Sequence, residues 1–245
     1  MAVPFSGLYP KAPSIYAPIE WKHLMKIKAF IFDLDGVLTD TAEYHYRSWK
    51  RLADELDVAF TREENEALRG IPRRESLLLM LKGRTYPEEQ LQQFMERKNN
   101  YYLNFVREIT AADVLPGARE LLNEIRTAGL KSGLGSASKN AREVIERLGI
   151  SSLLDAVSDG SSVQRQKPAP DLFLHAAGQL GFAAQECVVV EDAAAGIEAA
   201  RAGNFWTIGI GPASRLASAD LILPNLKNAR LGDLLAFFDT FQTER

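Results

Sequence analysis

Residues 28–41 read KAFIFDLDGVLTDT, an apolar run that ends in two acids one residue apart and then a glycine. A short apolar run that stops at a turn signal is typical of a buried β-strand, here Ala29–Phe32. Asp33 and Asp35 then stand at the carboxyl end of this strand, where a buried carboxylate is costly unless it has a partner. Ligands of open α/β sheets bind at that end of the strands. The two acids therefore predict a site whose partners come from elsewhere in the chain.

The composition of the chain excludes several classes of protein. The 245 residues are 46% hydrophobic and 25% charged, which is ordinary for a globular chain, and the net charge is −3. Such a charge gives no general attraction for nucleic acid or for a membrane surface, and no apolar stretch is long enough to span a bilayer. The one cysteine, Cys187, excludes a disulfide framework within the chain. We therefore expect a cytoplasmic protein that binds neither nucleic acid nor membrane.

Residues 1–26 form a separate N-terminal extension that is rich in proline and aromatic residues. The prolines predict an extended or irregular chain, and the segment lacks the pattern of a secretory signal. Tyr9, Tyr16 and Trp21 suggest that the extension packs on the body of the protein.

The next region, residues 41–112, carries almost no strand signal and predicts a helical domain inserted after the first strand. Its apolar residues recur with helical spacing, and prolines precede two of the helical stretches. The helices are expected at 41–57, 73–82 and 88–109. The core domain then consists of residues 27–40 and 113–245.

From Val114 onward, helices and strands alternate, which predicts a parallel sheet with helices on both faces. The strands are expected at 130–134, 156–158, 188–190, 206–211 and 221–224. The helices are expected at 118–128, 140–148, 167–181 and 193–203. Ser138 is a suitable N-cap for the helix over 140–148.

This topology predicts where the acids gather. If the first strand is central, the strand over 188–190 is its neighbour, and Glu191 and Asp192 lie across from Asp33 and Asp35. Four carboxylates at one place cannot all ionise without a cation among them. Oxygen ligands of high negative charge favour Mg²⁺.

Taken together, these motifs resemble those of the haloacid dehalogenase superfamily of phosphoryl-transfer enzymes. The resemblance rests on DLDG at 33–36, Ser136 after a strand, Lys167 before Pro168, and the acids Glu191 and Asp192. The helical insertion resembles the small cap domain of that superfamily. Further stretches resemble its sugar-phosphate mutases, among them LRGIPRRESL, ERKNNYY, GSASKN and EDAAAGIEA. The resemblance implies a Rossmann-like core with a helical cap, and a monomer.

The chemistry of Asp33 and Asp35 follows from phosphoryl transfer and from the resemblance. Asp33 is the expected nucleophile, because carboxylates can form aspartyl-phosphates, and Asp35 is the expected general acid and base. The resemblance assigns Mg²⁺ to Asp33, the backbone carbonyl of Asp35, Glu191 and Asp192. Taken alone, the first pair could instead cap a turn, and the second pair could equally begin a helix.

The resemblance also assigns residues to the substrate. The expected phosphate or substrate contacts are Arg69, Arg73, Ser136, Ala137, Ser138, Asn140 and Lys167. Arg73 resembles the cap arginine that holds the phosphate that is not transferred. Thr41 and His45 lie four residues apart at the start of a helix, on one face near the nucleophile, and His45 is implied to position Asp35. Without the resemblance, His45 is an ordinary surface histidine, and Lys167 and Arg73 are solvated cations.

Three features depart from the family pattern. Arg69 stands where a lysine is expected, Pro72 where a small polar residue is expected, and the loop over 158–166 differs from the usual one. These differences concern the orientation of the substrate more than the chemistry.

The implied activity is an intramolecular phosphotransfer between β-D-glucose 1-phosphate and glucose 6-phosphate. Asp33 would carry the phosphoryl group, and β-glucose 1,6-bisphosphate would be both the intermediate and the activator. The alternative is a Mg²⁺-dependent sugar-phosphate phosphatase of the same superfamily, in which water takes the phosphoryl group. A third interpretation, a sugar-phosphate-binding protein without activity, is disfavoured by the intact acids.

Overall fold

The first predicted strand, β1 (Ala29–Phe32), lies inside a six-stranded parallel sheet with the order β3-β2-β1-β4-β5-β6. The structure is a computed structural model and describes residues 27–242, so the predicted extension with Tyr9, Tyr16 and Trp21 lies outside the described residues. The other strands are β2 (Lys131–Gly135), β3 (Ala156–Ser158), β4 (Cys187–Glu191), β5 (Trp206–Ile210) and β6 (Leu221–Leu223). The predicted parallel sheet is confirmed.

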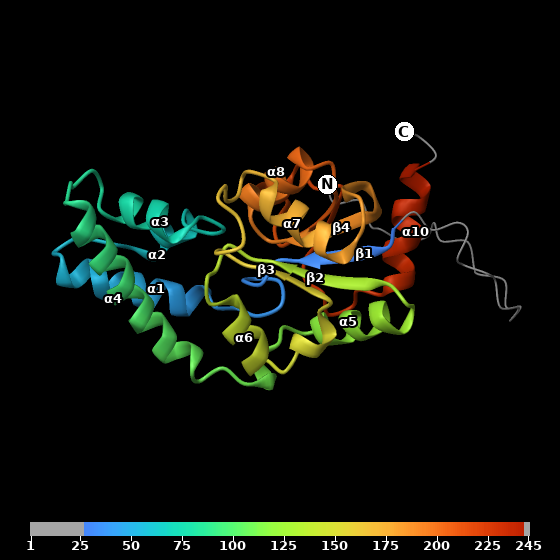
Figure 1. Cartoon of the computed structure of the whole chain (residues 1–245), viewed down its shortest axis with the longest axis horizontal. Coiled ribbons are helices and arrows are strands. Elements are labelled where there is room, and N and C mark those ends of the chain that lie inside the picture. The colour runs from blue at the N-terminus through green and yellow to red at the C-terminus, as the bar shows by residue number, and fades with distance from the viewer. Residues whose placement is uncertain (1–26, 243–245) are drawn as a thin grey trace, which may run out of the picture.

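Helices cover both faces of the sheet because successive side chains of a buried strand point in opposite directions. Phe30 and Phe32 pack in one cluster with residues of α5, α6 and α10, and Ala29 and Ile31 pack in another with residues of α7 and α8. Figure 1 shows α7 and α8 on one side of the sheet and α5 and α6 on the other. The core helices are α5 (Ala118–Thr127), α6 (Ala141–Arg147), α7 (Asp171–Leu180), α8 (Ala194–Ala202), α9 (Ala213–Leu216) and α10 (Leu231–Gln242). Sequence analysis did not predict α9 or α10.

The sheet order brings β4 beside β1. Phe32 lies opposite Val190, and the backbone N–H of Asp33 donates to the carbonyl oxygen of Val190 at 2.8 Å. The chain builds outward from β1 through β2 to β3, then returns to β4 on the other side of β1. This reversal is a topological switch point, where ligands of such sheets bind. The prediction that Glu191 and Asp192 follow the strand next to β1 is confirmed.

The start of one helix differs from its prediction. Asn140, not Ser138, stands before α6, and the Ser138 hydroxyl oxygen accepts from the backbone N–H of Asn140 at 3.2 Å. The carbonyl oxygen of Ser138 accepts from the N–H of Gly160 at 3.2 Å, so this residue is held by the neighbouring loop. The predicted N-cap at Ser138 is therefore wrong.

Four helices form a cap at one end of the molecule (Figure 1). They are α1 (Ala42–Glu55), α2 (Arg62–Glu66), α3 (Arg73–Met80) and α4 (Glu88–Val106). Pro72 and Pro87 directly precede α3 and α4, as expected for proline at a helix start. The cap has a hydrophobic cluster of its own, which includes Trp49, Leu77 and Phe94. None of the helices within residues 27–242 is both long and apolar enough to cross a bilayer.

Two chain segments join the cap to the core, and they run side by side. The Thr39 hydroxyl donates to the carbonyl oxygen of Asp113 at 2.8 Å, and the N–H of Leu115 donates to the carbonyl oxygen of Leu38 at 2.9 Å. At the base of α4, Tyr102 packs into the hydrophobic cluster of the core rather than that of the cap. The cap is thus tied to the core through paired linkers and one helix end.

Because the cap has its own hydrophobic cluster, a cavity inside it should destabilise the cap before the sheet. We expect Leu77→Ala, at a fully buried position, to cost about 2–5 kcal/mol of unfolding free energy and to speed amide hydrogen exchange in α1, α3 and α4. Leu78→Ala is the matched control, since Leu78 is 40% exposed and its loss should cost less than about 1 kcal/mol. Equal acceleration of exchange in the sheet would show that the cap is not a separate unit.

Candidate active site

Asp33 ends β1 in a position where both of its carboxylate oxygens are hydrogen-bonded. Oδ1 accepts from Nζ of Lys167 at 2.5 Å, and Oδ2 accepts from the backbone N–H of Asp35 at 2.9 Å. Asp33 is buried, yet it lines a cavity of about 440 Å³ between cap and core. A carboxylate that is oriented by two donors and faces a cavity is suited to nucleophilic attack on a bound group.

Lys167 is the cation at the centre of the acids. Its fully buried side chain donates to Asp33 and, at 2.7 Å, to Oε2 of Glu191. Burial favours the neutral amine, but the charges of Asp33 and Glu191 outweigh it and raise the pKa of Lys167. The ammonium therefore stays charged and offsets part of the negative charge. The Lys167–Pro168 peptide bond is cis.

Three carboxylates converge beside Lys167. Asp33, Glu191 and Asp192 each offer an oxygen, and these oxygens lie within 4.8 Å of one another. Burial, and then the charge of Asp33, raises the pKa of Glu191 to about 8 and that of Asp192 to about 7. Three carboxylate oxygens within reach of one ion are a donor set that fits a divalent cation. The side chain of Asp35 is outside this group, and its carbonyl ligand stays a prediction.

Two glycines make room for these acids. Gly36 has φ +81°, and a Cβ there would lie 2.2 Å from Oδ2 of Asp192. A Cβ at Gly196, in α8, would lie 2.1 Å from Oε2 of Glu191. The carboxylates could not occupy these positions beside larger residues.

Asp35 is held by the first residue of the cap. The Thr41 hydroxyl donates to Oδ1 of Asp35. Burial, and then the charge of Asp33, raises the pKa of Asp35 to about 6. Asp35 also lines the cavity. A carboxyl group with a pKa near neutrality can both take and return a proton, which suits general acid–base work.

His45 is bonded to a buried lysine rather than directly to Asp35. Nδ1 of His45 lies 2.9 Å from Nζ of Lys98, and its Nε2 is buried without a hydrogen-bond partner among the described residues. Burial, and then the charge of Lys98, lowers the pKa of His45 well below its usual range. The predicted role of His45 in positioning Asp35 is untested.

Sequence analysis missed Lys98, although a signal was present. Lys98 is 3% exposed and falls on the buried stripe of α4, with Leu91, Phe94, Met95 and Tyr102. A lysine at such a position of an amphipathic helix is unusual, because buried charges are costly without partners. Its partners are His45 and the faces of Trp49 and Tyr102, with ring centroids 4.8 and 4.9 Å away.

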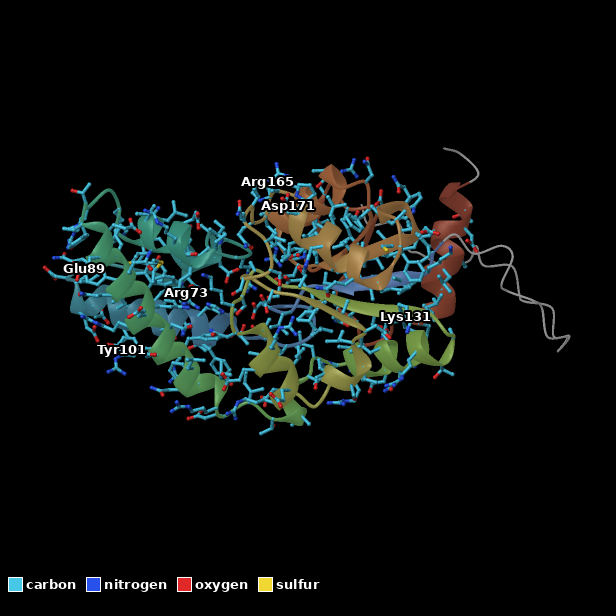
Figure 2. All side chains as sticks on the ribbon, viewed as in Figure 1. Arg73, Glu89, Tyr101, Lys131, Arg165 and Asp171 are labelled. Atoms are coloured by element: carbon cyan, nitrogen blue, oxygen red, sulfur yellow. The ribbon has the colours of Figure 1, made fainter. Side chains whose placement is uncertain are left out.

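A second polar group spans the cap and the core. Nη2 of Arg73 donates to Oδ1 of Asn99 at 2.7 Å, and Nδ2 of Asn140, from the core, donates to the same oxygen at 2.8 Å. Figure 2 shows Arg73 among the cap helices. Among the described residues, no carboxylate lies within ion-pair distance of Arg73. Arg73 and Asn140 line the cavity, so this side of it offers donors to an anion.

The cavity brings most of the predicted site residues together. Those on its wall are Asp33, Asp35, His45, Arg69, Arg73, Ala137, Ser138, Asn140 and Asp192. Thr41, Ser136, Lys167 and Glu191 are buried outside the wall. The Ser136 hydroxyl oxygen accepts from the N–H of Ser138 at 3.1 Å, so it shapes this loop. The expected phosphate contacts of Ser136 and Lys167 stay predictions.

The guanidinium group of Arg69, expected to contact the substrate, is bonded to two carboxylates of the protein. Nη1 of Arg69 donates to Oδ2 of Asp192 at 3.0 Å, while Nε and Nη2 donate to the carboxylate of Glu66 at 2.7 and 3.2 Å. Its guanidinium group is therefore bonded to two acids, one of which, Asp192, belongs to the group of three carboxylates. Its predicted contact with the substrate phosphate is untested.

Comparisons with known proteins identify the family of this chain. A model of the haloacid dehalogenase-like hydrolases matches residues 27–204. The β-phosphoglucomutase of Bacillus subtilis is 40% identical over 201 residues, which span 80% of this chain and 89% of that protein. The crystal structure of a β-phosphoglucomutase from Clostridium difficile is 38% identical, has a TM-score of 0.86, and covers 89% of this chain and 99% of its own. A phosphorylated-carbohydrates phosphatase of Thermotoga maritima is 28% identical over 184 residues, 74% of this chain and 84% of that one.

The chain therefore belongs to the haloacid dehalogenase-like hydrolase family, in the group that contains the β-phosphoglucomutases.

Gly36 provides a test of the metal-binding group. In Gly36→Ala the new methyl group would overlap Oδ2 of Asp192 and displace that carboxylate, so we expect Mn²⁺ to bind at least about tenfold more weakly. Gly129→Ala is the matched control, because Gly129 has a similar φ of +76° but open space around it. Mn²⁺ binding, followed by electron paramagnetic resonance, should be normal in the control. Normal binding in both variants would place the cation elsewhere.

Proposed function

We propose that this protein interconverts β-D-glucose 1-phosphate and glucose 6-phosphate by phosphoryl transfer through Asp33. The observation that carries the proposal is one cavity lined both by the carboxylates of Asp33 and Asp35 and by a group of hydrogen-bond donors, Arg73 with Asn140. A bisphosphate intermediate needs two such sites, one for the phosphate that reacts and one for the phosphate that does not. The similarity to two β-phosphoglucomutases supports the same activity.

Asp33 acts as the carrier of the phosphoryl group in the proposed reaction. The phosphorylated carboxylate passes PO₃ to the 6-hydroxyl of β-glucose 1-phosphate, which forms β-glucose 1,6-bisphosphate and frees Asp33. The intermediate turns around and returns its 1-phosphate to Asp33, which leaves glucose 6-phosphate. Lys167, at 2.5 Å from Oδ1, reduces the repulsion between the carboxylate and the phosphate.

Asp35 moves the proton in both half-reactions. It takes the proton of the 6-hydroxyl as that oxygen attacks the phosphorus, and it later gives the proton to O1 as the bond to the 1-phosphate breaks. A pKa of about 6 allows both directions near neutral pH. Thr41 holds the carboxyl group in place.

We infer that the cation is Mg²⁺, held by Asp33, Glu191 and Asp192 with the carbonyl oxygen of Asp35. Three buried carboxylates with only oxygen donors are a hard ligand set, which Mg²⁺ prefers over softer metals. When bound, the ion supplies positive charge against the phosphate oxygens.

The cap determines whether a sugar hydroxyl or water accepts the phosphoryl group from Asp33. Closed over the core, it completes the cavity with Arg73, His45 and Lys98 and limits access of water to the phosphorylated Asp33. A phosphatase, the alternative activity, would instead let water take the phosphoryl group. We further propose that β-glucose 1,6-bisphosphate activates the enzyme by phosphorylating Asp33, and that the protein works as a cytoplasmic monomer.

Product analysis separates the two activities. With β-glucose 1-phosphate and a trace of the 1,6-bisphosphate, we expect glucose 6-phosphate to form with little inorganic phosphate, and the α anomer to be inert. Asp33→Asn should abolish turnover, and Asp35→Asn should lower kcat by about 10²–10⁴-fold. Release of one inorganic phosphate for each substrate consumed would establish the phosphatase. Full turnover by Asp33→Asn would show that the nucleophile is misassigned.

The raised pKa values predict how Mg²⁺ stabilises the protein. Between about pH 4 and pH 8 the metal-free fold holds protons on Asp192 and Glu191 that the unfolded chain has released, so their contribution to stability falls as pH rises. Mg²⁺ replaces these protons and binds best when they have left. We expect the rise in Tm given by saturating Mg²⁺ to be small at pH 5 and roughly 5–10 °C at pH 8.

The control for this measurement is NaCl at equal ionic strength, which should give no such trend. A Mg²⁺ effect of the same size at both pH values would contradict the proposal that the ion displaces protons from these carboxyl groups.

A further inference from the structure

Arg215, from the short helix α9, reaches the same carboxylate as Arg69 but from the core. Its Nε donates to the backbone carbonyl oxygen of Asp192 at 2.8 Å, and its Nη2 lies 3.8 Å from Oδ2 of Asp192. Asp192 therefore contacts two guanidinium groups, that of Arg69 from the cap and that of Arg215 from the core. Sequence analysis gave no role to the stretch that contains Arg215.

Glu66 joins the two arginines. It accepts from Nε and Nη2 of Arg69, and its Oε2 lies 4.0 Å from Nη1 of Arg215. Glu66, Arg69, Asp192 and Arg215 thus form a ring of alternating charges, which we call the boundary ring. Two members belong to the cap and two to the core, so the ring is complete only when the cap is closed.

The backbone beside the ring is close-packed, which makes the ring sensitive to the position of the cap. A Cβ at Gly70, the residue after Arg69, would lie 3.1 Å from Cβ of Ala193, the residue after Asp192. When the cap moves away, Glu66 and Arg69 leave together because they lie within one turn of chain. Arg215 stays, since it is bonded to the backbone of Asp192 itself.

We propose that Arg215 is a positioning residue, which holds Asp192 ready for the cation and, through Glu66, links that orientation to closure of the cap. With the cap open, Arg215 alone keeps the carboxylate in place; with the cap closed, the ring fixes it from both sides. This inference rests on the proposed metal site and adds a residue that acts on it through Asp192.

Mn²⁺ binding to the complete protein without substrate tests the proposal. A positive charge near a cation site repels the cation, so simple removal of that charge would tighten Mn²⁺ binding. Loss of a group that orients a ligand weakens binding instead, and typically about tenfold or more. We therefore expect Arg215→Ala to bind Mn²⁺ about tenfold more weakly, with Arg215→Lys intermediate because lysine lacks the fork.

Arg201→Ala is the matched control for charge. Arg201 lies on α8 and contacts the carbonyl oxygen of Ser218 and the carboxylate of Asp220, and it bonds to neither Asp192 nor Glu66. We expect it to bind Mn²⁺ within about twofold of the unmodified protein.

The cap itself supplies the second readout. By small-angle X-ray scattering of the metal-free protein, Glu66→Gln and Arg215→Ala should each increase the radius of gyration, and the double variant should be no larger than the larger single one. Arg201→Ala should not change it.

The possible outcomes are distinct. Unchanged or tighter Mn²⁺ binding in Arg215→Ala and Arg215→Lys, or additive effects of the Glu66 and Arg215 variants, would overturn the positioning role while the metal site stands. Failure of the unmodified protein to bind Mn²⁺ would overturn both the metal site and this inference.

Discussion

The molecule depends on one buried ion cluster, in which Lys167 lies between Asp33 and Glu191 at the ends of two adjacent parallel strands. Each of these charges would cost several kcal/mol to bury alone, so each is tolerable only because of the others. Asp192 adds a third carboxylate, which Arg69 contacts, and the three acids together offer the oxygen donors that fit a divalent cation. The surrounding glycines, Gly36 and Gly196, are consequences of the same constraint, because the carboxylates need the space that side chains would fill.

The cap adds a second constraint, since it places more polar groups in a region that excludes water. Thr41 hydrogen-bonds to Asp35, and the buried Lys98 hydrogen-bonds to the half-buried His45. Asp35, the acid–base group of the core, therefore takes its hydrogen-bond partner from the first residue of the cap. Opening of the cap and loss of the reactive geometry are therefore expected to be parts of one motion.

Most of the fold could be predicted because hydrophobic periodicity and turn signals are local. Strand limits agree with the predicted ones to within one residue, and the neighbour of β1 followed from the alternation of helices and strands alone. Local sequence signals gave the wrong start for one helix and missed another, because tertiary contacts or short length hid these features. The backbone of Ser138 is engaged by Gly160, so α6 begins later than its apparent N-cap. The helix α9 is too short to carry a periodic signal, and with it Arg215 was missed.

The sequence by itself determined the sheet, the cap and the acids Asp33, Asp35, Glu191 and Asp192, because each is marked by a strand end or a turn next to it. Only the tertiary structure decided which groups pair with the cations Lys98 and Arg215, since the place of a residue on a helix face does not reveal its partner. Lys98 and Arg215 acquire their roles from neighbours 53 residues away and 23 residues away, at His45 and Asp192. Pairing over such separations is set by how helices and strands pack, which local patterns do not encode.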